Sequence, residues 1–267
     1  MSALHPADAR DAASAADEAP ALYRYVLRLG DLALVLGQRL SEWVGHAPAL
    51  EEDLGLANIA LDLVGQARLL LAYAGEIEGR GRGEDDIAFL RTHGEYLNPT
   101  LVEQPNGDFG ETIVRQVLID AFQLALYERL VSSRDERLAA IAEKAVKETR
   151  YHLRYSSSWL VRLGDGTEDS HARVQRALER LWPYTVELFE ADALDRDMAE
   201  SGIAPCLEEM RGAWNRHIDE VLAEATLDRP AERPYTWFGK RGEHSEHLGY
   251  LLAEMQYLQR AHPGARW

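Results

Sequence analysis

Apolar side chains recur along most of this chain with the 3.6-residue period of an α-helix. No stretch of useful length alternates between apolar and polar positions as a half-buried strand would. The pattern therefore predicts an all-α protein. Helices long enough for a bundle are expected over residues 22–44, 50–78, 111–132 and 135–163. Further helical segments are expected over 86–96, 168–200, 205–227 and 245–260.

The breaks between these helices predict how they are connected. Short turns join the first long helix to the second and the third to the fourth, whereas a long connection separates the two pairs. That order of two helix hairpins is typical of a ferritin-like four-helix bundle, here with additional C-terminal helices. Pro183 is expected to kink or split the helix over residues 168–200. Ser245 is expected to cap the last helix.

The N-terminal segment differs in composition from the rest of the chain. Residues 1–20 are rich in Ala and Asp, and they lack the basic-then-apolar order of a signal peptide. We expect a disordered tail at residues 1–20. Residues 21–267 are expected to form a single ferritin-like helical domain.

Composition and charge narrow the choice of partners and compartment. The net charge of -16 argues against nucleic acid or an anionic membrane as the main partner. The single cysteine, Cys206, excludes an internal disulfide and a Cys-rich zinc site, and it fits a reducing cytosol. No run of about 18 apolar residues is present. We therefore expect a cytoplasmic protein that neither spans a membrane nor binds nucleic acid.

Polar side chains interrupt the apolar stripe of the fourth long helix. At about 100° per residue, Thr149 and His152 fall within about 40° of the centre of that stripe. Glu148 lies about 80° away, at the margin. The inward pair is therefore Thr149-x-x-His152. Its spacing is that of the Glu-x-x-His segments of di-iron bundle proteins, but Thr stands where the Glu would be.

Polar residues also lie on the inward faces of other helices. Asp120 is in line with the apolar stripe of the third helix, and Gln66 shares a face with Leu63 on the second. Asp62 is rotated about 100° away from Leu63. The first helix is apolar over most of its circumference, so its phase does not decide whether Glu42 points inward.

A resemblance to a known family is carried by five stretches in the same order. They read SEWVGHAP, ALDLVGQARLLLAYAGE, LVEQPNGDFGETI, KAVKETRYHLRYSSSWLVRLGDGT and HSEHLGYLLAEMQYLQR. From about residue 21 to the end, the chain resembles the C subunits of bacterial 1,2-phenylacetyl-CoA epoxidases. The resemblance implies a ferritin-like, non-catalytic component of a multicomponent monooxygenase of aerobic phenylacetate breakdown. Its expected partners are a catalytic di-iron A subunit, a small B subunit, and a reductase with flavin and an iron–sulfur cluster.

The resemblance also maps the six ligand positions of the di-iron relative onto this chain. They are Glu42, Leu63, Gln66, Asp120, Thr149 and His152. Leu63 and Thr149 replace the two Glu of the Glu-x-x-His segments, and Gln66 replaces a His. Iron needs anionic oxygen ligands, so two irons could not be held here. We therefore propose no catalytic residue, metal or cofactor in this chain.

The three retained groups, Glu42, Asp120 and His152, leave alternatives open. We expect them to hydrogen-bond to one another and to Gln66 and Thr149, forming a satisfied polar core. One alternative is an oxidoreductase that holds a single divalent ion on the three retained groups. Another is a free-standing helical binding protein without these partners.

The loop PYTWFGKRG places Lys240 and Arg241 just before the last helix. Cations at a helix N-terminus could bind an anion such as a CoA phosphate. The pattern favours a solvated loop or a contact with another subunit over this interpretation.

Overall fold

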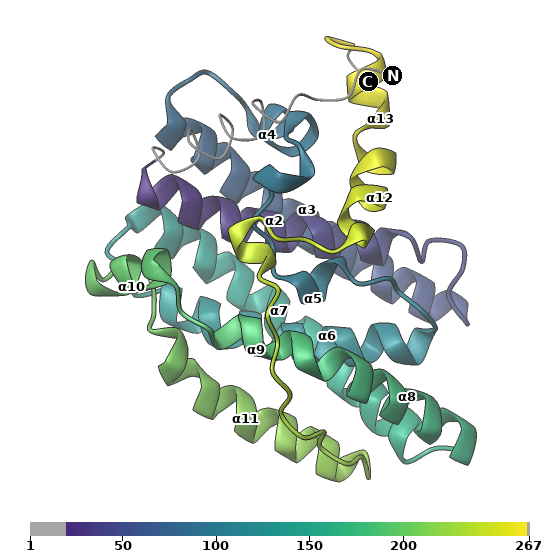
Figure 1. Ribbon diagram of the computed structural model, residues 1–267. Coiled ribbons are helices and arrows are strands. Elements are labelled where there is room, and N and C mark those ends of the chain that lie inside the picture. The colour runs from purple at the N-terminus through teal and green to yellow at the C-terminus, as the bar shows by residue number, and fades with distance from the viewer. Residues whose placement is uncertain (1–19, 266–267) are drawn as a thin grey trace.

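The computed structural model of this chain describes residues 20–265 (Figure 1). The predicted tail at residues 1–20 lies outside the described residues, apart from Pro20. All regular structure in the described part is helical, and no β-strand occurs there. The all-α prediction is confirmed.

Four long helices form the core of the fold. They are α2 (Ala21–Ser41), α3 (Leu50–Glu78), α6 (Phe109–Leu130) and α7 (Glu136–Gly164). Helix α2 packs along α3, α6 packs along α7, and α3 also contacts α7 (Figure 1). This is the ferritin-like pair of hairpins expected from the order of long helices and short turns.

Local chemistry sets the ends of the long helices. The side chains of Asp108 and Asp135 accept hydrogen bonds from the first turns of α6 and α7, as N-cap residues do. Helix α3 ends at Glu78, and its C-cap residue Gly79 adopts the left-handed conformation with φ 68°. Glycine also permits close packing inside the first hairpin. A Cβ at Gly30 would lie 2.7 Å from Leu71 Cδ2.

Shorter helices cover two sides of the bundle. On the side of α6 lie α8 (Glu168–Leu181) and α11 (Leu207–Glu224). Against α2 pack α5 (Thr100–Glu103), α10 (Ala193–Glu200) and α12 (Glu246–Met255). The remaining elements are α4 (Glu84–Leu90), η1 (His93–Glu95), η2 (Trp182–Tyr184), α9 (Thr185–Phe189), η3 (Gly239–Arg241) and α13 (Tyr257–Ala261).

Four details differ from, or sharpen, the expectations. The helix expected over residues 168–200 is split, with η2 at Pro183 between α8 and α9, as predicted. The short helix expected over residues 86–96 is divided into α4 and η1, and α5 lies within the long connection expected between the two helix pairs. Ser245 is the N-cap residue of α12, as predicted. Its hydroxyl makes no capping bond, and its backbone N–H donates to Glu103 Oε1 at 2.6 Å.

Helix α3 is the most apolar of the long helices. An 18-residue window within it has a mean hydropathy of 1.4, which by length and composition would suffice to cross a membrane. Its inward side chains, including Leu56, Ile59, Leu63 and Leu70, are buried among the other bundle helices. It is therefore a core helix of the bundle, although only 44% of that window is buried.

Candidate functional site

The centre of the bundle contains a group of buried polar side chains where α3, α6 and α7 meet. Each is at most 1% exposed. The group consists of Gln66, Gln116, Asp120, Gln123, Thr149, His152 and Ser156. The helix period correctly placed Gln66, Asp120, Thr149 and His152 on inward faces.

His152 is bonded to a residue on the neighbouring hairpin. Its Nε2 lies 3.1 Å from Oδ2 of Asp62, whose side chain is 39% exposed. Burial lowers the pKa of His152 below its usual value, although Asp62 and Glu148 act in the opposite direction. His152 therefore favours the neutral imidazole, and its Nδ1 has no partner among the described residues.

Asp120 is held by neutral groups. Ser156 Oγ donates to its Oδ2 at 2.8 Å, and Gln116 Nε2 donates to its Oδ1 at 3.4 Å. Burial raises the pKa of Asp120 to about 8, with Ser156 and Arg115 opposing that shift. A largely protonated carboxyl is the form that an apolar core tolerates best.

Gln66 and Thr149 also lie at the bundle centre, but neither is hydrogen-bonded to Asp120 or His152. Gln66 Nε2 donates to Glu148 Oε2 at 3.0 Å, and Lys144 pairs with the same carboxylate at 3.2 Å. The Thr149 hydroxyl has no hydrogen-bond partner in the described part of the chain. Leu63 is fully buried in the apolar core.

Glu42 lies at the end of the bundle rather than at its centre. It is the C-cap residue of α2, and its side chain is 38% exposed. Its carboxylate accepts hydrogen bonds from Arg39 Nη1 at 2.7 Å and from Asn106 Nδ2 at 2.9 Å. These bonds keep Glu42 at the edge of the bundle.

The expectation that the retained groups hydrogen-bond to one another is therefore wrong. Asp120 bonds to Ser156, and His152 bonds to Asp62. Glu42 bonds to Arg39 and Asn106 at the end of the bundle. Each group has a nearer partner on an adjacent turn or helix. Across residues 20–265, no three His, Cys, Asp or Glu side chains are grouped so that they could hold a metal ion. The residues at the bundle centre do not fit a di-iron centre.

Four participants were not identified from the sequence: Gln116 and Gln123 on α6, Ser156 on α7 and Asp62 on α3. Ser156 lies four residues after His152 on the same stripe of α7, so the helix period alone could have identified it. Asp62 could not have been identified in this way, because its rotation from Leu63 predicts only that it points away from the core.

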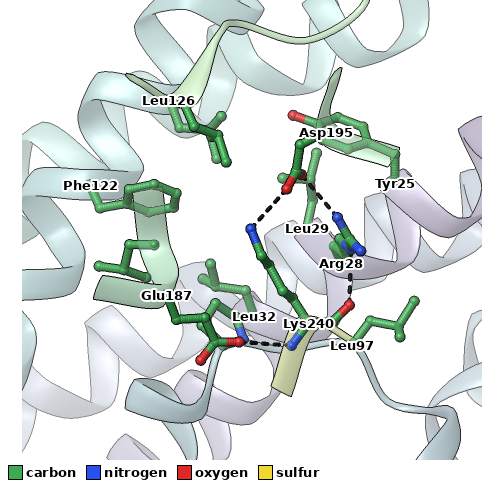
Figure 2. A pocket seen from close by; sticks show the side chains of 13 residues that line it. Tyr25, Arg28, Leu29, Leu32, Leu97, Phe122, Leu126, Glu187, Asp195 and Lys240 are labelled. Atoms are coloured by element: carbon green, nitrogen blue, oxygen red, sulfur yellow. Dashed lines mark hydrogen bonds and ion pairs between the residues drawn. The ribbon is translucent and has the colours of Figure 1, made fainter. Parts of the chain in front are cut away.

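A second polar cluster surrounds a small pocket between α2 and α6 (Figure 2). Asp195 accepts hydrogen bonds from Lys240 Nζ at 2.8 Å and from Arg28 Nη1 at 2.9 Å. Arg28 Nε also donates to the Lys240 carbonyl at 3.1 Å. Glu187 accepts from the Lys240 backbone N–H at 2.9 Å. The other walls of the pocket are mainly apolar, with Leu29, Leu32, Phe122 and Leu126 among them.

This cluster changes the interpretation of the loop PYTWFGKRG. Lys240 is only 6% exposed, and its charge is matched by Asp195 inside the protein. A solvated loop is therefore the wrong description of this position, and Lys240 has no free charge to offer an external anion. The bonds instead anchor the C-terminal loop to α2 and α10.

Comparison with known proteins agrees with this geometry. Residues 2–267 match the family PaaA_PaaC, described as phenylacetic acid catabolic protein. The chain belongs to the PaaA_PaaC family. The chain is 55% identical over 246 residues to a curated relative, the C subunit of 1,2-phenylacetyl-CoA epoxidase from Escherichia coli (strain K12). The alignment covers 92% of this chain and 99% of that relative, so the resemblance predicted from five stretches is confirmed.

Membership of the PaaA_PaaC family accounts for the ferritin-like fold and places the chain in phenylacetate catabolism. Family membership also bears on the polar residues at the bundle centre. Gln66, Asp120 and His152 lie at positions to which the resemblance maps metal ligands, but Leu63 and Thr149 supply no carboxylate there.

Proposed function

We propose that this chain is a non-catalytic structural subunit of a bacterial multicomponent monooxygenase that epoxidises the ring of phenylacetyl-CoA. It pairs with the di-iron catalytic subunit and stabilises it. The O2- and NADPH-dependent chemistry belongs to that partner and to the reductase. The assembly also includes the small B subunit, and it works in the cytoplasm. Residues 21–267 act as one folded unit.

One observation carries this proposal: the six mapped ligand positions do not form a ligand set. Leu63 has no donor atom, and the Thr149 hydroxyl is neutral. Glu42 is bonded to Arg39 and Asn106 at the bundle end, away from the buried group that includes Asp120 and His152. Iron in such sites relies on anionic oxygen ligands and imidazoles that converge on the metal.

The proposal is tested by the metal content and native mass of the purified chain, alone and co-expressed with the catalytic subunit. We expect no stoichiometric iron in the chain alone and a stable heteromeric complex with the partner. An iron content that matches a dinuclear centre, together with the absorption spectrum of an oxo-bridged di-iron site, would instead support a metal-binding oxidoreductase. Failure to form any complex would support a free-standing binding protein.

A further inference from the structure

A short segment near the C-terminus fastens the last helices to the bundle. After α11, residues 226–238 form no helix and lead to η3 and then to α12, which packs on α2 (Figure 1). We call residues 239–245 the C-terminal clasp. Backbone N–H groups of the clasp donate to side chains on other segments: Gly239 to Thr100 at 3.2 Å, Lys240 to Glu187 at 2.9 Å and Ser245 to Glu103 at 2.6 Å.

His244 lies in the clasp between two oxygen acceptors. Its side chain is only 1% exposed. The Nδ1 atom lies 2.8 Å from Glu103 Oε2, and the Nε2 atom lies 2.7 Å from the Tyr96 carbonyl oxygen. A neutral imidazole has a proton on one nitrogen only, so it could donate to only one of these two acceptors. An imidazolium has a proton on each nitrogen and donates to both.

The surroundings of Glu103 fit the ionised form of this carboxyl group. Its Oε1 accepts from the Ser245 N–H at 2.6 Å, and its Oε2 accepts from Asn98 Nδ2 at 3.0 Å as well as from His244. A protonated carboxyl would turn a donor toward one of these donors. The contacts therefore match a buried ion pair, in which the carboxylate of Glu103 and the imidazolium of His244 compensate each other.

The charges around this ion pair also favour the imidazolium. Charged and titratable side chains come from each element packed around it: Asp31 and Arg39 on α2, Arg91 and Tyr96 in the connection between the hairpins, Tyr184 and Tyr235 beside Glu103, and Lys240, Arg241, Glu243, Glu246 and His247 along the C-terminal segment. The cations among them each have a carboxylate of their own: Arg39 has Glu42, Arg91 has Asp31, Lys240 has Asp195 and Arg241 has Asp192. Burial acts to lower the pKa of His244, but Glu103, the Tyr96 carbonyl and the charge of Asp31 outweigh burial, so this pKa lies above its usual value.

We propose that His244 is a pH-sensitive latch for the C-terminal clasp. As an imidazolium, it fastens the clasp to the connection between the two hairpins, through Glu103 and the Tyr96 carbonyl. Loss of its proton leaves one acceptor without a donor and leaves Glu103 without its counter-charge inside the protein, so the clasp opens. This inference goes beyond the proposed function and does not depend on it.

The direction of the pH dependence follows from linkage. The pKa of His244 is higher in the closed clasp than its usual value of 6.5, so opening releases a proton. The latch therefore holds at full strength below about pH 6.5, and it weakens as the pH rises through the folded-state pKa of His244.

The first test observes the ring of His244 directly. Nitrogen-15 NMR of the full chain at pH 6.5 distinguishes protonated from unprotonated ring nitrogens. His244 should be predominantly protonated on both nitrogens, whereas His217, whose pKa is lowered by burial, should be predominantly neutral. A predominantly neutral His244 at this pH would overturn the inference.

The second test measures opening of the clasp by hydrogen exchange of the Gly239, Lys240 and Ser245 amides. After correction for the intrinsic exchange rate, their opening constant should rise by up to about tenfold per pH unit above about pH 6.5, and it should level off above the folded-state pKa of His244. These amides should also open more often than amides in the middle of α6, as local opening requires. Equal opening constants would mean that only global unfolding releases the clasp, which would overturn the latch.

Substitutions assign the pH dependence to the latch. His244→Gln removes the titrating group, so the clasp amides should lose their pH dependence, and their opening constant at pH 6.5 should rise by at least about tenfold. His217→Gln is the matched control, because this half-buried histidine lies on α11 outside the clasp, and it should keep the pH dependence. Glu103→Gln removes the counter-charge and should shift His244 toward the neutral form at pH 6.5. A pH dependence that survives His244→Gln would show that another group controls the clasp.

Discussion

Nε2 of His152 lies 3.1 Å from Oδ2 of Asp62, so a fully buried imidazole on α7 is bonded to a partly exposed carboxylate on α3. The bond links the two hairpins of the bundle at the level where the resemblance maps metal ligands. It directs a retained ligand position toward the surface of the bundle rather than toward Asp120.

Replacing His152 with Ala should destabilise the protein without affecting catalysis. The ring is 0% exposed, and its removal leaves a cavity that we expect to cost about 2–3 kcal/mol of the free energy of unfolding. Urea unfolding measures this cost, and His46→Ala at an exposed position is the control. Epoxidation by the reconstituted complex should be unchanged wherever native mass shows it intact. Loss of activity in an intact complex would contradict the structural role.

Asp120 should make stability depend on pH. Its folded-state pKa of about 8 exceeds the usual carboxyl value near 4, so folding takes up a proton between these limits. The contribution of Asp120 to stability therefore falls as the pH rises from about 4 to about 8. Asp120→Asn cannot ionise and should become progressively more stable than the unmodified chain over this window. The measurement is urea unfolding at pH 5, 6, 7 and 8, with the exposed Asp169→Asn as control. A constant difference between Asp120→Asn and the unmodified chain would contradict this account.

Thr149→Val should stabilise the protein. The hydroxyl of Thr149 is buried without a hydrogen-bond partner among the described residues, and its replacement by a methyl group removes that desolvation cost. We expect a gain of about 1 kcal/mol in the free energy of unfolding. Thr112→Val is the matched control, because the buried Thr112 hydroxyl donates to the Asn106 carbonyl and accepts from Trp43. The control should lose stability, and a loss in both variants would show that Thr149 has a partner.

The pair of Arg91 and Asp31 should be the costliest ion pair to break. Both side chains are at most 2% exposed, and Asp31 Oδ2 accepts from Arg91 Nη1 at 2.9 Å and from the Leu97 N–H at 2.8 Å. Asp31→Asn leaves a buried guanidinium without its counter-charge, which we expect to cost about 3–5 kcal/mol.

The surface pair of Arg137 and Glu76 provides the comparison. Its atoms are 3.5 Å apart, and both side chains are more than half exposed. Glu76→Gln should cost less than about 1 kcal/mol, because solvent screens the charges. Chemical unfolding of both variants measures the two costs, and equal costs would show that burial does not decide the strength of these pairs.

Much of the fold of this protein can be predicted from the helix period. The period predicted the four long helices, the two hairpins, and the inward positions of Gln66, Asp120, Thr149 and His152, all of which are buried. Ser156 lay within reach of the same reasoning, since it shares the stripe of α7. These features depend on residues within one helix, so the sequence alone determines them.

Only the tertiary structure decided which groups meet. Glu42 bonds to Asn106, Asp62 to His152, and Lys240 to Asp195, and in each case at least 45 residues separate the partners along the chain. A helix period determines the direction of a side chain around its own axis, but it carries no information about the neighbour on another helix. That neighbour depends on how the hairpins and the C-terminal segments pack together. For the same reason, only the packed structure showed that Leu50, Leu54 and Leu61 remain exposed on α3.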